Sequence, residues 1–184
     1  REVVWIGALL IVVAAWTAGA AAGEPHSLKR ANELYQQKQY AEALKAFDQA
    51  IKENPVHADS FRRRALCRQR LDDLPGALAD LDRAIAVDPT DATSWSSRSS
   101  LKRRMKDAAG AWADIERAAA LAPDNAHILN NRGLLRYDRG DYSGAVDDYT
   151  RALRADPRMS AAYNNRGLAR EKLGDLKGAL ADYT

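Results

Sequence analysis

The stretch from Leu129 to Pro157, LNNRGLLRYDRGDYSGAVDDYTRALRADP, decides the fold of this 184-residue chain. Much of it returns 34 residues later, from Tyr163 onward, as YNNRGLAREKLGDLKGALADYT. When residues 126–150 are set over residues 160–184, thirteen of twenty-five positions are identical without a gap. A fixed period of this length is the mark of stacked helical repeats, so the sequence predicts a repeat array.

The prolines extend the same period towards the start of the chain. Pro55, Pro89, Pro123 and Pro157 each stand 34 residues apart. Proline cannot extend a helix and restricts the residue before it, so each repeat is expected to end there. The predicted repeats cover about residues 24–57, 58–91, 92–125, 126–159 and 160–184, with the last one truncated.

Each repeat, numbered so that its proline is position 32, reads as two amphipathic helices joined by a tight turn, as at Gly140-Asp141. Position 20 is always alanine, position 8 is small and position 24 is large. Small residues at positions 8 and 20 would let the two helices approach closely, and the large residue would fill the remaining space. The pairs at positions 8 and 24 are Ala31 and Phe47, Ala65 and Leu81, Ser99 and Ile115, Gly133 and Tyr149, and Gly167 and Tyr183.

This pattern, with large residues at position 4, alanine at position 27 and proline at position 32, resembles the tetratricopeptide repeat over residues 24–184. The resemblance implies an all-α fold, a right-handed solenoid of antiparallel helix pairs. It also implies that the first helices line a concave face that holds an extended peptide or a partner helix. The chain departs from the family at Ser27 in position 4, at the arginines of position 7, and at Lys106-Asp107, where the third repeat lacks the Gly-Asp turn.

Charges recur with the repeat as well. Position 7 is arginine in every repeat, and position 23 is aspartate in the last four. These side chains are predicted to meet across the turn as an ion pair within each repeat, and Asp80–Arg83 and its equivalents could add pairs along the second helix. We favour a structural charge ladder; ligand binding by the same residues is the alternative. The predicted pairs are Arg64–Asp80, Arg98–Asp114, Arg132–Asp148 and Arg166–Asp182.

Members of the family usually point positions 2, 5, 6, 9, 12 and 13 of the first helix into the groove. Guanidinium groups bind carboxylates in bidentate fashion, and asparagine can hold a peptide backbone through its donor and acceptor. We therefore expect these positions to bind an extended, partly acidic segment of another protein, with ordinary solvated surface as the alternative. The candidate residues are Arg62, Arg63, Arg70, Arg103 and Arg104, with the amides Asn130, Asn131, Asn164 and Asn165.

A two-carboxylate clamp, which some members of the family use to grip acidic C-termini, is not supported. Its pattern needs lysine at position 5 and asparagine at position 9 of one repeat, with asparagine, lysine and arginine in the next two. Only Asn32 fits, because the other positions hold Leu28, Arg63, Thr93 and Ser97.

No motif for catalysis, a cofactor or a metal is present in the sequence. His26, His57 and His127 fall near repeat boundaries without metal-ligand spacing, and no glycine-rich phosphate loop or nucleophile elbow occurs. The only cysteine, Cys67, is interpreted as a small buried residue. The net charge of +3, from 28 basic and 25 acidic residues, does not favour nucleic acid.

The uncharged run Val3–Ala22, VVWIGALLIVVAAWTAGAAA, sets residues 1–23 apart. Its length just spans about 30 Å of hydrocarbon, and its small residues fit signal-peptidase cleavage. A cleaved secretory signal and a retained membrane anchor are the two leading interpretations, and a buried core helix is the third. The first two place the repeats in the periplasm or outside the cell, with membrane contact only through residues 1–22.

The predicted function is a non-catalytic interaction scaffold or adaptor. The alternative is an accessory array of a larger enzyme or assembly factor whose active domain lies beyond Thr184. If the chain ends there, Leu176, Leu180 and Tyr183 are expected to be exposed, and the last repeat to fray or self-associate.

Overall fold

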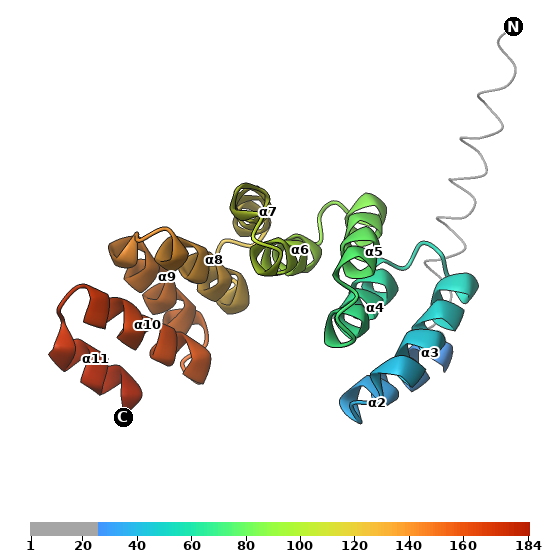
Figure 1. The fold of residues 1–184 in the computed structure, drawn as a ribbon, viewed down its shortest axis with the longest axis horizontal. Coiled ribbons are helices and arrows are strands. Elements are labelled where there is room, and N and C mark those ends of the chain that lie inside the picture. The colour runs from blue at the N-terminus through green and yellow to red at the C-terminus, as the bar shows by residue number, and fades with distance from the viewer. Residues whose placement is uncertain (1–25) are drawn as a thin grey trace, which may run out of the picture. The chain divides into compact units, whose positions relative to one another are not determined.

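The computed structural model describes residues 26–184, and these residues form α-helices joined by short turns (Figure 1). The described part contains no strand, which confirms the predicted all-α fold. Its ten helices are α2 (His26–Gln36), α3 (Tyr40–Glu53), α4 (Ala58–Arg70), α5 (Leu74–Val87), α6 (Ala92–Arg104), α7 (Ala108–Leu121), α8 (Ala126–Asp138), α9 (Tyr142–Ala155), α10 (Ser160–Lys172) and α11 (Leu176–Tyr183).

The chain divides into two compact units, the first ending at Asp88 and the second running from Pro89 to Thr184. In the first unit α2 packs against α3 and α4 against α5 as antiparallel pairs, and α3 joins the pairs by packing against α4. In the second unit the pairs are α6 with α7, α8 with α9 and α10 with α11. There α7 packs against α8 and α9 against α10, so each pair buries one of its sides on the next.

Aspartate begins each second helix from α5 onward. The carboxylate of Asp141, for example, accepts a hydrogen bond of 2.9 Å from the backbone N–H of Gly144, and this caps α9. Equivalent caps lie at Asp73, Asp107 and Asp175. The chain enters α9 through Gly140 at φ +78, and Lys106 takes the same left-handed conformation before α7 at φ 64. The missing glycine of the third repeat therefore does not abolish its turn.

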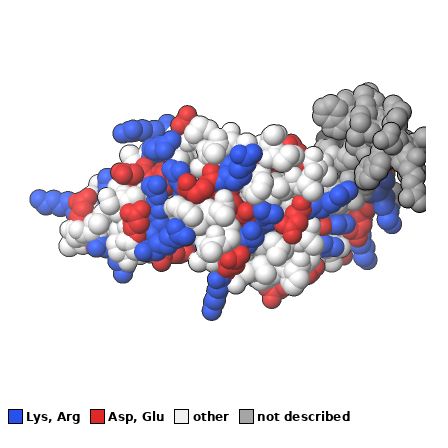
Figure 2. Space-filling view, turned by 90° about the horizontal axis from the view of Figure 1, so that it is seen from above, with Lys and Arg blue, Asp and Glu red and all other residues white. Residues whose placement is uncertain are grey.

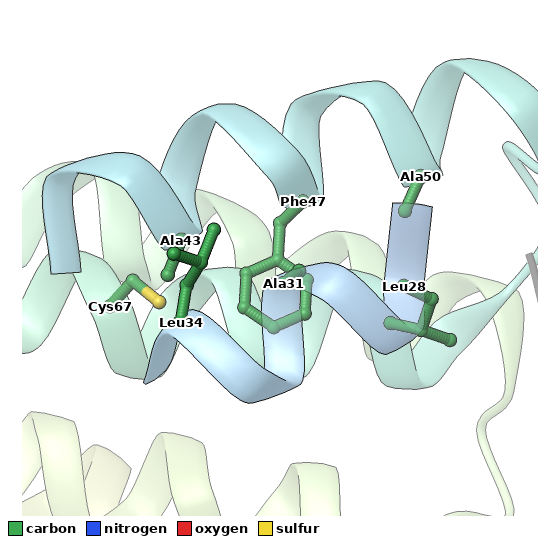
Figure 3. Packing of buried hydrophobic residues seen from close by; sticks show 7 residues of the cluster. All are labelled: Leu28, Ala31, Leu34, Ala43, Phe47, Ala50 and Cys67. Carbon is green, nitrogen blue, oxygen red and sulfur yellow. The ribbon is translucent and has the colours of Figure 1, made fainter. Parts of the chain in front are cut away.

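The small and large residues meet in the core as predicted. In the first unit Phe47 of α3 packs among Ala31 and Leu34 of α2 and Cys67 of α4, all buried (Figure 3). In the second unit Gly133 faces Tyr149 so closely that a Cβ on the glycine would lie 2.6 Å from Cε1 of the ring. Any side chain at position 133 would therefore force Tyr149 or its helix to shift.

Two expectations concern the ends of the chain. The signal or anchor predicted for residues 1–23 lies outside the described residues. Within residues 26–184, no helix combines the length and the apolar character needed to cross a membrane. At the other end, Leu176 and Leu180 of α11 are more than half exposed.

Candidate functional site

Arginine–aspartate pairs cross the interior of the last four helix pairs. In the fourth repeat Nε and Nη2 of Arg132 donate to the two carboxylate oxygens of Asp148 at 2.9 and 2.6 Å. The same pair forms between Arg64 and Asp80 and between Arg98 and Asp114. It forms again between Arg166 and Asp182. The predicted pairing is confirmed, but these aspartates are buried, so the ladder is interior structure rather than solvated surface.

A second cation, one helical turn further along, reaches each of these aspartates. Arg136 lies 3.3 Å from Asp148, and it also donates to the carbonyl oxygen of Gly144 at 2.9 Å. Position 11 supplies this cation in the other three repeats as Arg68, Lys102 and Arg170. Sequence reasoning missed it, although a spacing of four residues from position 7 places both side chains on one helix face.

The position 7 arginines also connect one helix pair to the pair before it. Nη1 of Arg64 donates to Asp48 of α3 at 2.7 Å, and Nη1 of Arg166 donates to Thr150 of α9 at 3.2 Å. The ion pairs suggested along the second helices, such as Asp80–Arg83, are replaced by other contacts. The guanidinium of Arg83 lies over the ring of Phe61. Its equivalent in α9, Arg151, donates to the carbonyl oxygen of Pro123.

Two candidate arginines of the first unit are bound to a carboxylate of their own helix. Both Arg62 and Arg63 contact Asp59, and Nη1 of Arg63 also donates to Oδ1 of Asn32 at 3.2 Å. Burial acts to raise the pKa of Asp59, but the charges and hydrogen bonds of the two arginines outweigh it, so that this pKa lies below its usual value. The sequence analysis did not predict these ion pairs, although Asp59 stands three and four residues before the two arginines, which is the spacing of side chains on one helix face. Arg70 is exposed, and its hydrogen bond to Tyr35 raises its pKa.

Three of the four candidate amides form, together with Ser96, two hydrogen-bonded rungs across the first helices of the second unit. The Nδ2 amide of Asn131 on α8 donates to the hydroxyl of Ser96 on α6 at 3.1 Å. The Nδ2 amide of Asn165 on α10 donates to Oδ1 of Asn130 on α8 at 3.0 Å. We call these four residues the amide ladder. Within the described residues the side-chain oxygens of Asn131 and Asn165 accept no hydrogen bond.

Three further candidates lie in the second unit. Asn164 and Arg104 are exposed. Arg103 donates to both carboxylate oxygens of Asp138, at 2.5 Å from Nε and 3.0 Å from Nη2, and this hydrogen bonding raises the pKa of Arg103. Three of the candidate arginines thus lie in the first unit, and the other two lie in the second unit together with the four amides. That all nine line one groove stays a prediction.

A cavity of about 250 Å³ lies beside Arg103, where the α6–α7 turn meets the end of α8. Its lining is Arg103, Lys106, Ala108, Leu135, Asp138 and Arg139. The guanidinium of Arg139 sits 4.1 Å from the ring centroid of Trp112, a cation–π contact. Sequence reasoning selected only Arg103 of this set, because the other members come from a turn and a helix end that the groove positions do not cover.

The described residues offer little for other chemistry. No group of three or more His, Cys, Asp or Glu side chains within residues 26–184 is placed to hold a metal ion. Cys67 is fully buried, and burial raises the pKa of its thiol to about 11. Leu28, where the carboxylate clamp needs lysine, is a core residue. On the face that Figure 2 shows, basic and acidic side chains are interspersed.

A family model described as "Tetratricopeptide repeat" matches residues 32–102 and 98–164 of the chain, well over half of its length. The chain belongs to the tetratricopeptide repeat family. Hsp70-Hsp90 organizing protein 1 of Glycine max is 40% identical to this tetratricopeptide protein over 52 residues, which make up 28% of the chain and 9% of that relative. The chain therefore spans only a small part of the relative's length.

Solved structures share the fold. A thermophilic tetratricopeptide protein of Thermus thermophilus aligns with a TM-score of 0.75 at 22% identity, covering 88% of each chain. The pilF protein of Pseudomonas aeruginosa aligns with a TM-score of 0.78 at 17% identity, covering 92% of this chain and 75% of its own. Family membership supports a protein–protein interaction scaffold as the class of function.

Proposed function

We propose that this tetratricopeptide array is a non-catalytic scaffold that binds an extended segment of another protein along its first helices. The observation that carries the proposal is the amide ladder of α6, α8 and α10. In each rung the donor amide is already held in place, which leaves the oxygens of Asn131 and Asn165 oriented for another donor. An extended polypeptide offers a backbone N–H at nearly every residue, and prior ordering of the two side chains lowers the entropy cost of binding it.

The name of the soybean relative supports a protein ligand, because that protein is named for organising Hsp70 and Hsp90. The manner of binding would differ from a carboxylate clamp, since Leu28 is buried where the clamp needs a lysine. In the first unit, an acidic ligand would have to compete with Asp59 for Arg62 and Arg63. The amide ladder therefore supports recognition of a partner's backbone more strongly than these arginines support recognition of its acidic side chains.

An affinity capture with matched variants tests this proposal. The bait is the array, and the disabled bait carries Asn131→Ala with Asn165→Ala. Gln37→Ala, which changes an exposed amide in the first unit, serves as control. Captured proteins are cross-linked and their contact sites mapped. A protein that is retained by the array and the control, lost by the disabled bait and cross-linked near α8 and α10 supports the scaffold. Equal retention by all three baits refutes binding through the amide ladder.

We propose further that residues 1–23 direct the array to the periplasmic or outer side of a membrane, as a signal or an anchor. The support is the uncharged run of residues 3–22. Fusing residues 1–184 to a reporter that is active only after export tests this location. An inactive reporter on a stably produced fusion would refute it, and the size of the exported product separates cleavage from anchoring.

A further inference from the structure

The cavity beside Arg103 concentrates positive charge in the second unit. Arg103, Lys106 and Arg139 line it, and Asp138 is the one carboxylate in its lining. Asp138 is bound to Arg103, and within the described residues no carboxylate pairs with Lys106 or Arg139. Two uncompensated cations therefore face one small space, where an anion would gain from both.

The remaining walls limit the size and the kind of this anion. Leu135 and Ala108 supply apolar surface, and Trp112 holds the guanidinium of Arg139 by stacking. A volume of about 250 Å³ lies below the usual range of sites for whole cofactors, about 300–1,000 Å³, and suits one side chain with an acidic end. Aspartate and glutamate match both the charge and the apolar walls.

We propose that this cavity binds the carboxylate of an aspartate or glutamate in the segment that the array holds. This inference rests on the proposed function and specifies one acidic residue of the bound segment. The carboxylate bonds Arg139 and Lys106, and it competes with Asp138 for Arg103. Asp138 thus occupies part of the site in the free protein, and its side chain is 42% exposed, which leaves it room to move aside.

The competition by Asp138 predicts the direction in which each substitution changes binding. Asp138→Asn keeps the size of the side chain but frees the guanidinium of Arg103, so binding of a carboxylate tightens. Arg139→Gln removes a direct partner, so binding weakens. Each effect is about twofold to fivefold, because partly exposed ion pairs are screened by water.

The test uses two short capped peptides that differ only in one central residue, glutamic acid or glutamine, between leucines. NMR follows the side-chain N–H signals of Arg103 and Arg139 and the side-chain amides of Asn131 and Asn165 in the array. The expected result is a saturable shift at both arginines with the glutamic acid peptide alone. Arg139→Gln should weaken that binding and Asp138→Asn should tighten it. Arg154→Gln removes an exposed charge elsewhere in the second unit and should leave it unchanged.

Three results would overturn the proposal: equal shifts with both peptides, weaker binding by Asp138→Asn, or equal losses for Arg139→Gln and Arg154→Gln. Shifts at Asn131 and Asn165 with both peptides, and none at the arginines, would reject the acidic cavity while supporting the scaffold. The absence of any shift at the arginines rejects the cavity whatever partner the capture experiment finds.

Discussion

Asp148 offers the sharpest test of the interior charge ladder. Its side chain is 1% exposed, and it accepts two hydrogen bonds from Arg132 and lies 3.3 Å from Arg136. The substitution Asp148→Asn preserves its shape but removes the charge and turns one acceptor oxygen into a donor. Two guanidinium groups then face a neutral amide in a buried setting, and one N–H of Arg132 loses its acceptor.

The expected loss of stability follows from this geometry. Removing one partner of a buried pair costs about 3–5 kcal/mol, because the other charge stays buried without compensation. The side chain of Arg132 retains 14% exposure, so water relieves part of that cost. We expect Asp148→Asn to lower the free energy of unfolding by about 3 kcal/mol, and hence the melting temperature by about 6–12 °C.

Thermal and urea unfolding, followed by circular dichroism, measure this loss. Asp147→Asn is the matched control, because Asp147 is the exposed neighbour on the same helix and should change stability by less than about 0.5 kcal/mol. Adding Arg132→Gln to Asp148→Asn should cost less than the sum of the two single changes, since the pair is then removed as a whole. Equal effects of Asp147→Asn and Asp148→Asn would refute a structural role for the ladder.

Three further predictions concern the core, the caps and the thiol. Gly133→Ala should destabilise the array by about 1–3 kcal/mol in urea unfolding, because the added methyl group overpacks against Tyr149. Adding Tyr149→Leu, which reproduces the Ala65–Leu81 pair of the second repeat, should restore part of the lost stability. Asp141→Ala should cost about 1 kcal/mol in the same assay by removing the cap of α9, whereas Ser143→Ala, at an exposed site, should cost little. Burial raises the pKa of the Cys67 thiol from 9.0 to about 11, so the folded state keeps a proton that the unfolded state loses; stability should fall as pH rises from about 9 to 11. Cys67→Ala should flatten this part of a plot of melting temperature against pH.

The fold is predictable from the sequence because small and large residues recur at the same positions in every repeat. Gly133 opposite Tyr149 and Ala31 opposite Phe47 encode the close helix pair in residue size alone. The interior arginine–aspartate pairs were equally predictable, because the same separation of sixteen residues recurs in four repeats.

The candidate site was harder to predict, because its contacts depend on side chains outside the pattern. Asp59 binds Arg62 and Arg63, and Asp138 binds Arg103, so these selected arginines already have carboxylate partners. The direction of a carboxylate is set by tertiary packing: Asp148 turns inward to Arg132, whereas the sequence also allowed a bond along its own helix. The cavity depends on the meeting of a turn and a helix end, which no local spacing reveals.

The two kinds of charge in this array have separate consequences. The arginine and aspartate of positions 7 and 23 are identical in repeats two to five and lie inside, so they fix how each helix pair closes. Position 12 varies from repeat to repeat and lies nearer the solvent: Arg103 pairs with Asp138, Tyr35 with Arg70, and Glu171 accepts a hydrogen bond from Tyr183 at 3.1 Å. The pairs of positions 7 and 23 hold each helix pair closed. Substitutions at position 12 can therefore alter what the surface binds without opening the helix pairs. Exchanging the residues of one such pair should therefore change ligand preference with little effect on unfolding, the reverse of what we expect from Asp148→Asn.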